Sequence, residues 1–323
     1  MKKASELDLE TITVGQDGRV LTARYASPPL NFATTAFIRD LDILTATADR
    51  DDTVGAIVLT GGLNGRFLTH ADPTELGGAA QTPLPALSMR AMRPIWRLTR
   101  TLLRTPGALR ATESAGGQVG AALAWGYRWR RTILRMNHSS TVYIAAINGP
   151  TTGGGHEIAL ACDLRFVSDA PHIRLGQIES LVGLIPGGGG TQRLPKMIGT
   201  AHALAHMLEG APLTAQQAHT LGLVNAVVPD VDLVAHAQQT ATRLARRSPV
   251  SVQAIKELTY FANSRPLGAG LDTELAGFLT AALQPSMKAT LDAFTTDLDE
   301  QHDSPLVTDT QSWLDGTRVD QTS

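Results

Sequence analysis

Two glutamates, Glu157 and Glu179, stand beside glycines and could act together as an acid–base pair. Glu157 comes three residues after Gly154, in a glycine run that joins an apolar segment to a helical one. A helix that begins at such a turn has unpaired backbone N–H groups at its N-terminus, where the dipole also favours negative charge. Because residues three apart share a helix face, the sequence predicts a carboxylate beside an oxyanion-stabilising pocket.

The elements that must position these residues are short buried strands and amphipathic helices. An apolar run at 142–147 is typical of a buried strand, and a helix is expected to begin near His156, after the glycines at 153–155. Other strands are expected at 12–14 and 20–25, which form a hairpin around Asp17-Gly18, and at 56–59 and 223–228. Beyond about residue 232 the chain is expected to be helical, with breaks before Pro249, Pro266 and Pro285. The pattern predicts an α/β core followed by helices.

Residues 77–140 have an unusual composition. A loop is expected at 77–85, and helices at 88–103 and 121–136. Ten arginines and three of the four tryptophans fall in this region, against one acidic residue, Glu113. One interpretation is a solvated basic helix face, packed at its tryptophans or set at a subunit contact. It is favoured because runs of charged residues usually lie on the surface. The other is a basic lid that receives the phosphates of coenzyme A or a carrier protein.

Composition and motifs exclude several function classes. The net charge of −2 does not point to nucleic acid or to a membrane surface, and no stretch approaches a membrane span. Cys162, the only cysteine, is expected in the core, and the cytoplasm is the expected compartment. The glycines at 187–190 lack the Lys-Ser/Thr of a nucleotide-binding P-loop. Histidines and cysteines do not recur at the spacing of a metal site, so no metal is expected.

A string of spaced motifs resembles the enoyl-CoA hydratase/isomerase (crotonase) superfamily. The matching stretches are Ala145-Ala146-Ile147-Asn148-Gly149, Gly153-Gly154-Gly155-His156-Glu157, Ala161-Cys162-Asp163, Gly176-Gln177-Ile178-Glu179 and residues 185–193. The resemblance implies a spiral core of β-β-α turns over residues 1–230, with residues 77–140 as an enlarged insertion. It also implies a helical segment at 231–303 that drives assembly into trimers or dimers of trimers. A polar, frayed tail is expected at 304–323.

The resemblance also implies roles for individual residues. Ala71 and Gly154 would supply the two backbone N–H groups of the oxyanion hole, although His70 stands where glycine is commonest. Glu157 would activate water and Glu179 would deliver the proton to Cα. The spacing between these glutamates is two residues longer than usual, and the extra length is expected in a hairpin at 170–174.

Coenzyme A contacts follow less directly from the resemblance. Thr69, Ala71 and Asp72 would lie along the pantetheine path. Pro28 occupies a place where Lys or Arg is frequent, so the phosphates are assigned instead to Arg24, Lys288 or the arginine-rich insertion, without a choice among them.

The expected function is that of an enoyl-CoA hydratase, which adds water reversibly to a 2-enoyl-CoA, as in fatty-acid β-oxidation. The acyl-CoA thioester is the substrate, and no separate cofactor is expected. Retention of both glutamates favours hydration, since members that only shift a double bond typically lack the counterpart of Glu157. The alternatives are an enoyl-CoA isomerase, an acyl-CoA thioester hydrolase, or an acyl-CoA-binding protein without turnover.

Overall fold

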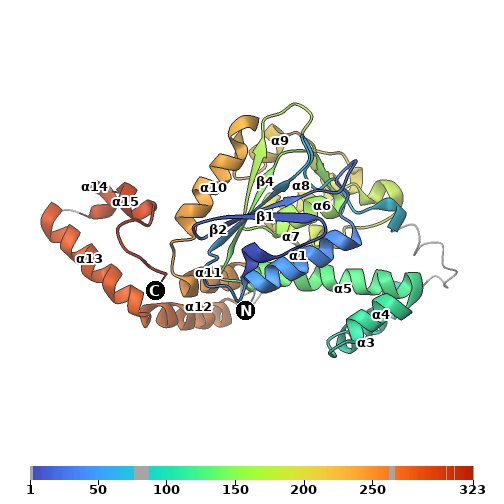
Figure 1. Cartoon of the computed structure of the whole chain (residues 1–323), viewed down its shortest axis with the longest axis horizontal. Coiled ribbons are helices and arrows are strands. Elements are labelled where there is room, and N and C mark those ends of the chain that lie inside the picture. Colours follow the sequence, from blue (N-terminus) through green and yellow to red (C-terminus); the bar gives the residue numbers. More distant parts are fainter. Residues whose placement is uncertain (1–2, 76–86, 262–265, 303, 309, 323) are drawn as a thin grey trace.

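A six-stranded sheet forms the centre of the molecule (Figure 1). The computed structural model describes residues 3–75, 87–261, 266–302, 304–308 and 310–322. β1 pairs antiparallel with β2, and the remaining neighbours are parallel. The strands, in spatial order, are β1 (Ile12–Asp17), β2 (Val20–Tyr25), β3 (Ala56–Gly61), β4 (Val142–Ile147), β6 (Leu164–Ser168) and β8 (Ala226–Val228).

Local signals explain the first strands. The expected hairpin is confirmed, with Asp17 opposite Val20 and Gly18 at a positive φ of 52° in the turn. Glycine adopts this conformation without steric cost. The expected strand at 223–228 is shortened to β8, which begins at Ala226.

Both faces of the sheet are covered, which is why its parallel strands are almost continuously apolar. Along β3 and β4, Ala56, Val58, Ile144 and Ala146 pack with α10 (Leu233–Leu244) on one face. Their neighbours Ile57, Leu59, Ala145 and Ile147 pack in the larger core, with residues of α1 (Thr35–Ala48) and α6 (Gly153–Ala161). Successive side chains alternate between the faces because a strand has a period of two.

The arginine-rich region forms three helices at one end of the molecule (Figure 1). They are α3 (Met89–Leu102), α4 (Ala108–Ala115) and α5 (Gly117–His138). The sequence predicted α3 closely, missed α4 and placed the start of α5 four residues too late. α4 is only eight residues long and lies between Gly107 and Gly116, so few residues were available to signal a helix. The loop expected at 77–85 lies outside the described residues.

The arginines divide into two groups. Arg128, Arg131 and Arg135 on α5 all bond the buried Asp42 carboxylate of α1, and Arg128 also bonds Glu113 of α4 at 2.5 Å. On α3 the arginines alternate with exposed apolar residues such as Met92 and Leu98. The charges of α5 therefore join α5 to α1, whereas most of those of α3 face outward.

Later helices follow the glycine and proline signals. The helix expected after residue 190 is divided by Gly199 into α7 (Gly190–Ile198) and α8 (Thr200–Glu209). α9 (Ala215–Thr220) begins with the expected capping box between Thr214 and Gln217. The expected proline breaks are confirmed in α11 (Pro249–Tyr260), α12 (Leu267–Ala282) and α13 (Pro285–Gln301).

The polar tail is more ordered than its composition suggests. It contains α14 (Pro305–Thr308) and α15 (Thr310–Leu314), and α13 to α15 form the end of the molecule opposite α3 (Figure 1). Trp313 Nε1 donates to Asp297 of α13 at 3.1 Å, and Arg318 forms an ion pair with the same carboxylate at 2.6 Å. These contacts replace the fraying that the sequence predicted.

Candidate active site

A small two-stranded sheet brings the two glutamates together. β5 (Thr151–Thr152) runs parallel to β7 (Leu175–Gly176), so the chain leaves both strands at the same end. Glu157 follows β5 in α6, and Glu179 begins the 3₁₀ helix η2 (Glu179–Val182) after β7. A Cβ placed on Gly153 would lie 3.3 Å from Glu179 Oε1, so this carboxylate lies directly against the start of α6.

The details of these connections differ from two expectations. α6 begins at Gly153 rather than near His156, so the glycine run forms the first turn of the helix itself. Residues 170–174 do not form a hairpin, because β6 belongs to the large sheet and β7 to the small one. The extra length therefore serves as a link between two sheets.

The Glu157 carboxylate is buried and held by backbone donors. Its side chain is 2% exposed, and its two oxygens accept the N–H groups of Gly188 at 2.7 Å and Gly190 at 2.8 Å. Burial raises the pKa of Glu157 to about 7, the negative charge of Glu179 adds to this effect, and the backbone donors oppose it. Glu157 can therefore gain or lose a proton near neutral pH.

Glu179 is held by an amide and a histidine behind it. With the Gln177 amide oriented to satisfy both neighbours, its Nε2 donates to Glu179 Oε1 at 3.0 Å and its Oε1 accepts from His156 Nδ1 at 3.1 Å. Burial lowers the pKa of His156 to about 3, so its ring is neutral. Burial also raises the pKa of Glu179. His156, to which the sequence analysis gave no catalytic role, thus orients the Gln177 amide that donates to Glu179.

Ala71 and Gly154 lie side by side at the mouth of this arrangement. Ala33 pairs with Ala71 as a parallel bridge, in which Ala33 N donates to His70 O at 2.7 Å and Asp72 N donates to Ala33 O at 3.3 Å. In such a bridge the N–H of Ala71 itself points away from Ala33. A Cβ on Gly154, in the first turn of α6, would lie 3.6 Å from Ala71 Cβ. Since first-turn N–H groups lack acceptors within their helix, both residues can offer a backbone donor here.

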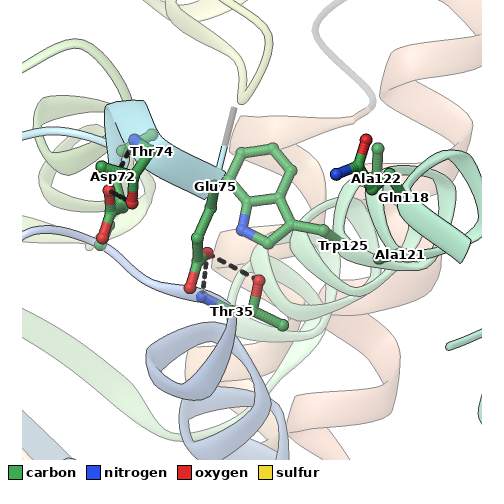
Figure 2. Close-up of a pocket in the computed structure, with 10 residues that line it drawn as sticks. Thr35, Asp72, Thr74, Glu75, Gln118, Ala121, Ala122 and Trp125 are labelled. Carbon is green, nitrogen blue, oxygen red and sulfur yellow. Dashed lines mark hydrogen bonds between the residues drawn. The ribbon is translucent and has the colours of Figure 1, made fainter. Parts of the chain in front are cut away.

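A cavity of about 330 Å³ opens beside Ala71. Its lining includes Asp72, Glu75 and Trp125, and Figure 2 shows the Trp125 indole reaching from α5 toward Glu75. Glu75 accepts both the N–H and the hydroxyl of Thr35 at 2.7 Å, which joins the 72–75 segment to the start of α1. The cavity therefore has one wall from the core and one from the arginine-rich region.

The residues predicted to contact coenzyme A are not all near this cavity. Ala71 and Asp72 line it, and the Thr69 carbonyl accepts the N–H of Thr152 at 2.6 Å just before α6. Arg24 is an exposed residue of β2, and Lys288 lies on α13. Neither Arg24 nor Lys288 lines the cavity.

Several residues of this site were not found from the sequence. Gly188 and Gly190 were read only as a helix start, and Gln177 only as part of a motif. Trp129 was assigned to a packed helix face, but its indole contacts Gly154 and Gly188, as a Cβ on either glycine would lie within 3.2 Å of it. A glycine run that returns to a buried carboxylate is the one signal that could have suggested these contacts.

Cys162 is fully buried, and burial raises the pKa of its thiol to about 12, in keeping with a core residue. Within the described ranges, His, Cys, Asp and Glu side chains form no group of three or more suited to a metal ion. None of the helices described has both the length and the apolar character to cross a bilayer.

The chain is similar to several known proteins. A family model described as enoyl-CoA hydratase/isomerase matches residues 125–304. The short-chain-enoyl-CoA hydratase of Clostridium acetobutylicum is 27% identical over 271 residues, which cover 84% of this chain and 87% of that protein. The fatty acid oxidation complex subunit alpha of Shewanella frigidimarina is 50% identical over 104 residues, which are 32% of this chain and only 14% of that subunit.

A solved structure extends the likeness to nearly the whole fold. The structure of Pseudomonas aeruginosa DspI superposes with a TM-score of 0.71 at 27% identity, covering 91% of this chain and 97% of that one. The α/β fold with a helical C-terminal segment, expected from the sequence, is thereby confirmed. Since the family model matches more than half of the residues, the chain belongs to the enoyl-CoA hydratase/isomerase family, within the crotonase superfamily.

Proposed function

We propose that the protein is an enoyl-CoA hydratase, which adds water reversibly to a 2-enoyl-CoA to give the 3-hydroxyacyl-CoA. The observation that carries the proposal is the pair of glutamates, one buried and one partly buried and both with a raised pKa, beside the adjacent backbones of Ala71 and Gly154. Two carboxylates in opposite protonation states can divide the proton transfers of the reaction. The reaction moves water and a proton but no electrons, so the proposal includes no redox cofactor.

The thioester oxygen would accept the N–H groups of Ala71 and Gly154. As negative charge develops on this oxygen during the reaction, each donor becomes more valuable, and one such donor is worth ~3–4 kcal/mol in a well-studied enzyme. Glu157 and Glu179 then act at C3 and C2 of the same acyl group. In hydration Glu157 takes a proton from the attacking water and Glu179 gives a proton to C2; in dehydration both transfers reverse.

The difference in burial between Glu157 and Glu179 indicates which of them holds the shared proton before substrate binds. Glu157 is 2% exposed, whereas Glu179 is partly exposed and has the amide donor of Gln177 to stabilise its charge. Glu157 is therefore the harder group to ionise and holds the proton that the pair shares. This arrangement suits the dehydration direction, in which ionised Glu179 removes the proton from C2. Hydration begins from the less populated arrangement with the proton on Glu179.

The decisive experiment follows the absorbance of the 2-enoyl thioester with crotonyl-CoA and a long-chain 2-enoyl-CoA. Wild type should consume at least one substrate, and both Glu157→Gln and Glu179→Gln should be at least ~10²-fold slower, because each loses one proton-transfer group. If wild type leaves both substrates unchanged, hydration is wrong. Conversion of 3-enoyl-CoA to 2-enoyl-CoA, or release of free coenzyme A, would then identify an isomerase or a thioester hydrolase.

We also propose that the subunit assembles into trimers or dimers of trimers. α12 exposes an apolar row that includes Leu271, Leu275 and Phe278, with 52%, 58% and 67% of their surfaces accessible. Such a row favours burial against another chain. Light scattering should give three or six times the subunit mass of 34.3 kDa, and Phe278→Glu should lower that mass. A wild-type mass of one subunit would contradict the proposal.

A further inference from the structure

The indole of Trp129 lies between the two halves of the site. Trp129 is 2% exposed on α5, and its Cη2 atom lies 3.2 Å from the position that a Cβ on Gly154 would occupy. At the other end of the ring, Nε1 lies 2.1 Å from the corresponding Cβ position on Gly188. The ring therefore extends from the backbone that we assign to the thioester oxygen to the turn that holds Glu157.

The indole N–H is a buried donor that borders this space. An indole nitrogen can only donate, and the large majority of buried donors in proteins are hydrogen bonded. Trp129 Nε1 is buried and has no hydrogen-bond partner among the residues that the structure describes. Glu157 Oε2 lies 2.6 Å from the same Cβ position on Gly188. The donor and the carboxylate thus border one small volume without bonding each other.

We propose that Trp129 Nε1 donates a hydrogen bond to the oxygen on C3 of the substrate. The inference rests on the proposed function, since it needs a substrate with oxygen at C3. With the thioester oxygen between Ala71 and Gly154, C3 lies two carbons from the carbonyl carbon, and Glu157 must reach the oxygen on it. Trp129 borders that place from α5 and makes the second polar contact to the same oxygen.

The hydrogen bond from Trp129 does not alter the number of protons transferred in the reaction. In dehydration the C2–H bond breaks and its proton goes to Glu179, while the C3–O bond breaks and the oxygen takes a proton from Glu157. The electron pair of the C2–H bond becomes the new double bond, and water leaves. Trp129 stabilises the negative charge on the departing oxygen, and in hydration it holds the oxygen of the attacking water while Glu157 removes its proton.

The contact gives a specific expectation for binding. A 3-hydroxyacyl-CoA would accept the indole N–H, whereas the saturated acyl-CoA of equal length has no oxygen at C3. Trp129→Phe keeps an aromatic ring at this position of α5 but removes the N–H. The variant should therefore lose affinity for the hydroxylated ligand and retain affinity for the saturated one.

The test measures the affinities of 3-hydroxybutyryl-CoA and butyryl-CoA by calorimetry in a Glu179→Gln background, where turnover is expected to be blocked. Adding Trp129→Phe should weaken 3-hydroxybutyryl-CoA about 10-fold and butyryl-CoA less than about 2-fold. Trp96→Phe, on α3, is the matched control and should change neither affinity. Equal weakening of both ligands would show that Trp129 is only a wall, and no weakening would show that it makes no bond; either result overturns the inference.

A second measurement tests the role of Trp129 if the Glu179→Gln variant binds both acyl-CoA ligands too weakly for calorimetry. In the otherwise wild-type protein, Trp129→Phe should lower kcat for hydration of crotonyl-CoA about 10-fold, with KM within about 2-fold. An unchanged kcat, or a change confined to KM, would overturn the inference. Failure of wild type to hydrate any enoyl-CoA would instead refute the proposed function, and the two failures are therefore distinguishable.

Discussion

Gly190 donates its backbone N–H to Glu157 Oε1 at 2.8 Å, although the two residues are 33 positions apart in the chain. The donor stabilises the ionised carboxylate, while burial of the same group favours the protonated form. The two effects oppose each other, and burial is the larger. A carboxyl group that would otherwise be ionised at neutral pH is thereby brought close to the point where both forms are present.

The first prediction concerns the pH dependence of kcat/KM. Both directions of the reaction need exactly one proton on the pair of glutamates, so both profiles should be bell-shaped with the same limbs. The alkaline limb should fall near pH 7, where the pair loses its last proton. The acid limb should lie above the ordinary glutamate pKa, because burial raises the pKa of Glu179. Initial rates with crotonyl-CoA and 3-hydroxybutyryl-CoA across pH 4 to 10 would check this; differing limbs in the two directions would contradict it.

The second prediction uses two neighbouring glycines. A Cβ on Gly188 would lie 2.1 Å from Trp129 Nε1 and 2.6 Å from Glu157 Oε2, so both groups must move in Gly188→Ala. We expect kcat to fall at least ~10²-fold, the order of loss that follows misplacement of a reacting group. Gly187→Ala is the control, because a Cβ there has no neighbour within 4 Å. Similar rates for the two variants would show that the position of Glu157 does not depend on this turn.

The third prediction concerns the buried charge cluster. Burial disfavours the charged form of Asp42, but its bonds with Arg131 and Arg135 outweigh this and lower its pKa. Asp42→Asn would remove the carboxylate that three arginines share, and we expect it to cost ~3 kcal/mol or more of unfolding free energy at pH 7. Glu10→Gln removes an exposed partner of Arg39 and should cost less than ~1 kcal/mol.

Urea unfolding of both variants would measure these costs. The contribution of Asp42 also has a defined pH window, because its folded pKa is depressed. It should be complete above the unfolded aspartate pKa of ~3.9 and be lost as the pH falls through the folded value. Equal stability of the two variants at pH 7 would mean that the cluster contributes no more than a surface ion pair.

The fourth prediction tests whether the Gln177 amide stabilises the ionised form of Glu179. Gln177→Leu removes the amide that donates to Glu179 at 3.0 Å, so the ionised form of Glu179 loses stabilisation. Exchange of the C2 protons of butyryl-CoA with deuterium should slow by about 10-fold near pH 6, and raising the pH should restore part of the rate. Gln216→Leu, on the exposed face of α9, is the control and should exchange at the wild-type rate. A slower rate that no pH restores would point to a displaced Glu179 instead.

The sequence predicted the elements that depend on local chemistry. The hairpin at Gly18, the capping box at Thr214 and the proline-initiated helices all depend on residues a few positions apart. Glu157 and Glu179 were found because motifs on either side of them recur in the family. Trp129 could not be found in this way, since its contacts with Gly154 and Gly188 depend on how α5 packs across α6. Local patterns do not determine that packing.

The placement of three arginines along α5 separates two roles of this helix. Arg128, Arg131 and Arg135 anchor its C-terminal half to Asp42, and Trp129 lies within the anchored part. Trp125 lies one turn earlier, where α5 lines the open cavity. Changes of sequence in the N-terminal half of α5, which supplies Gln118, Ala121, Ala122 and Trp125 to the lining, can therefore reshape the cavity while the indole stays in place. On the proposed function, the choice of acyl group could diverge over evolution without disturbing the chemistry at C3.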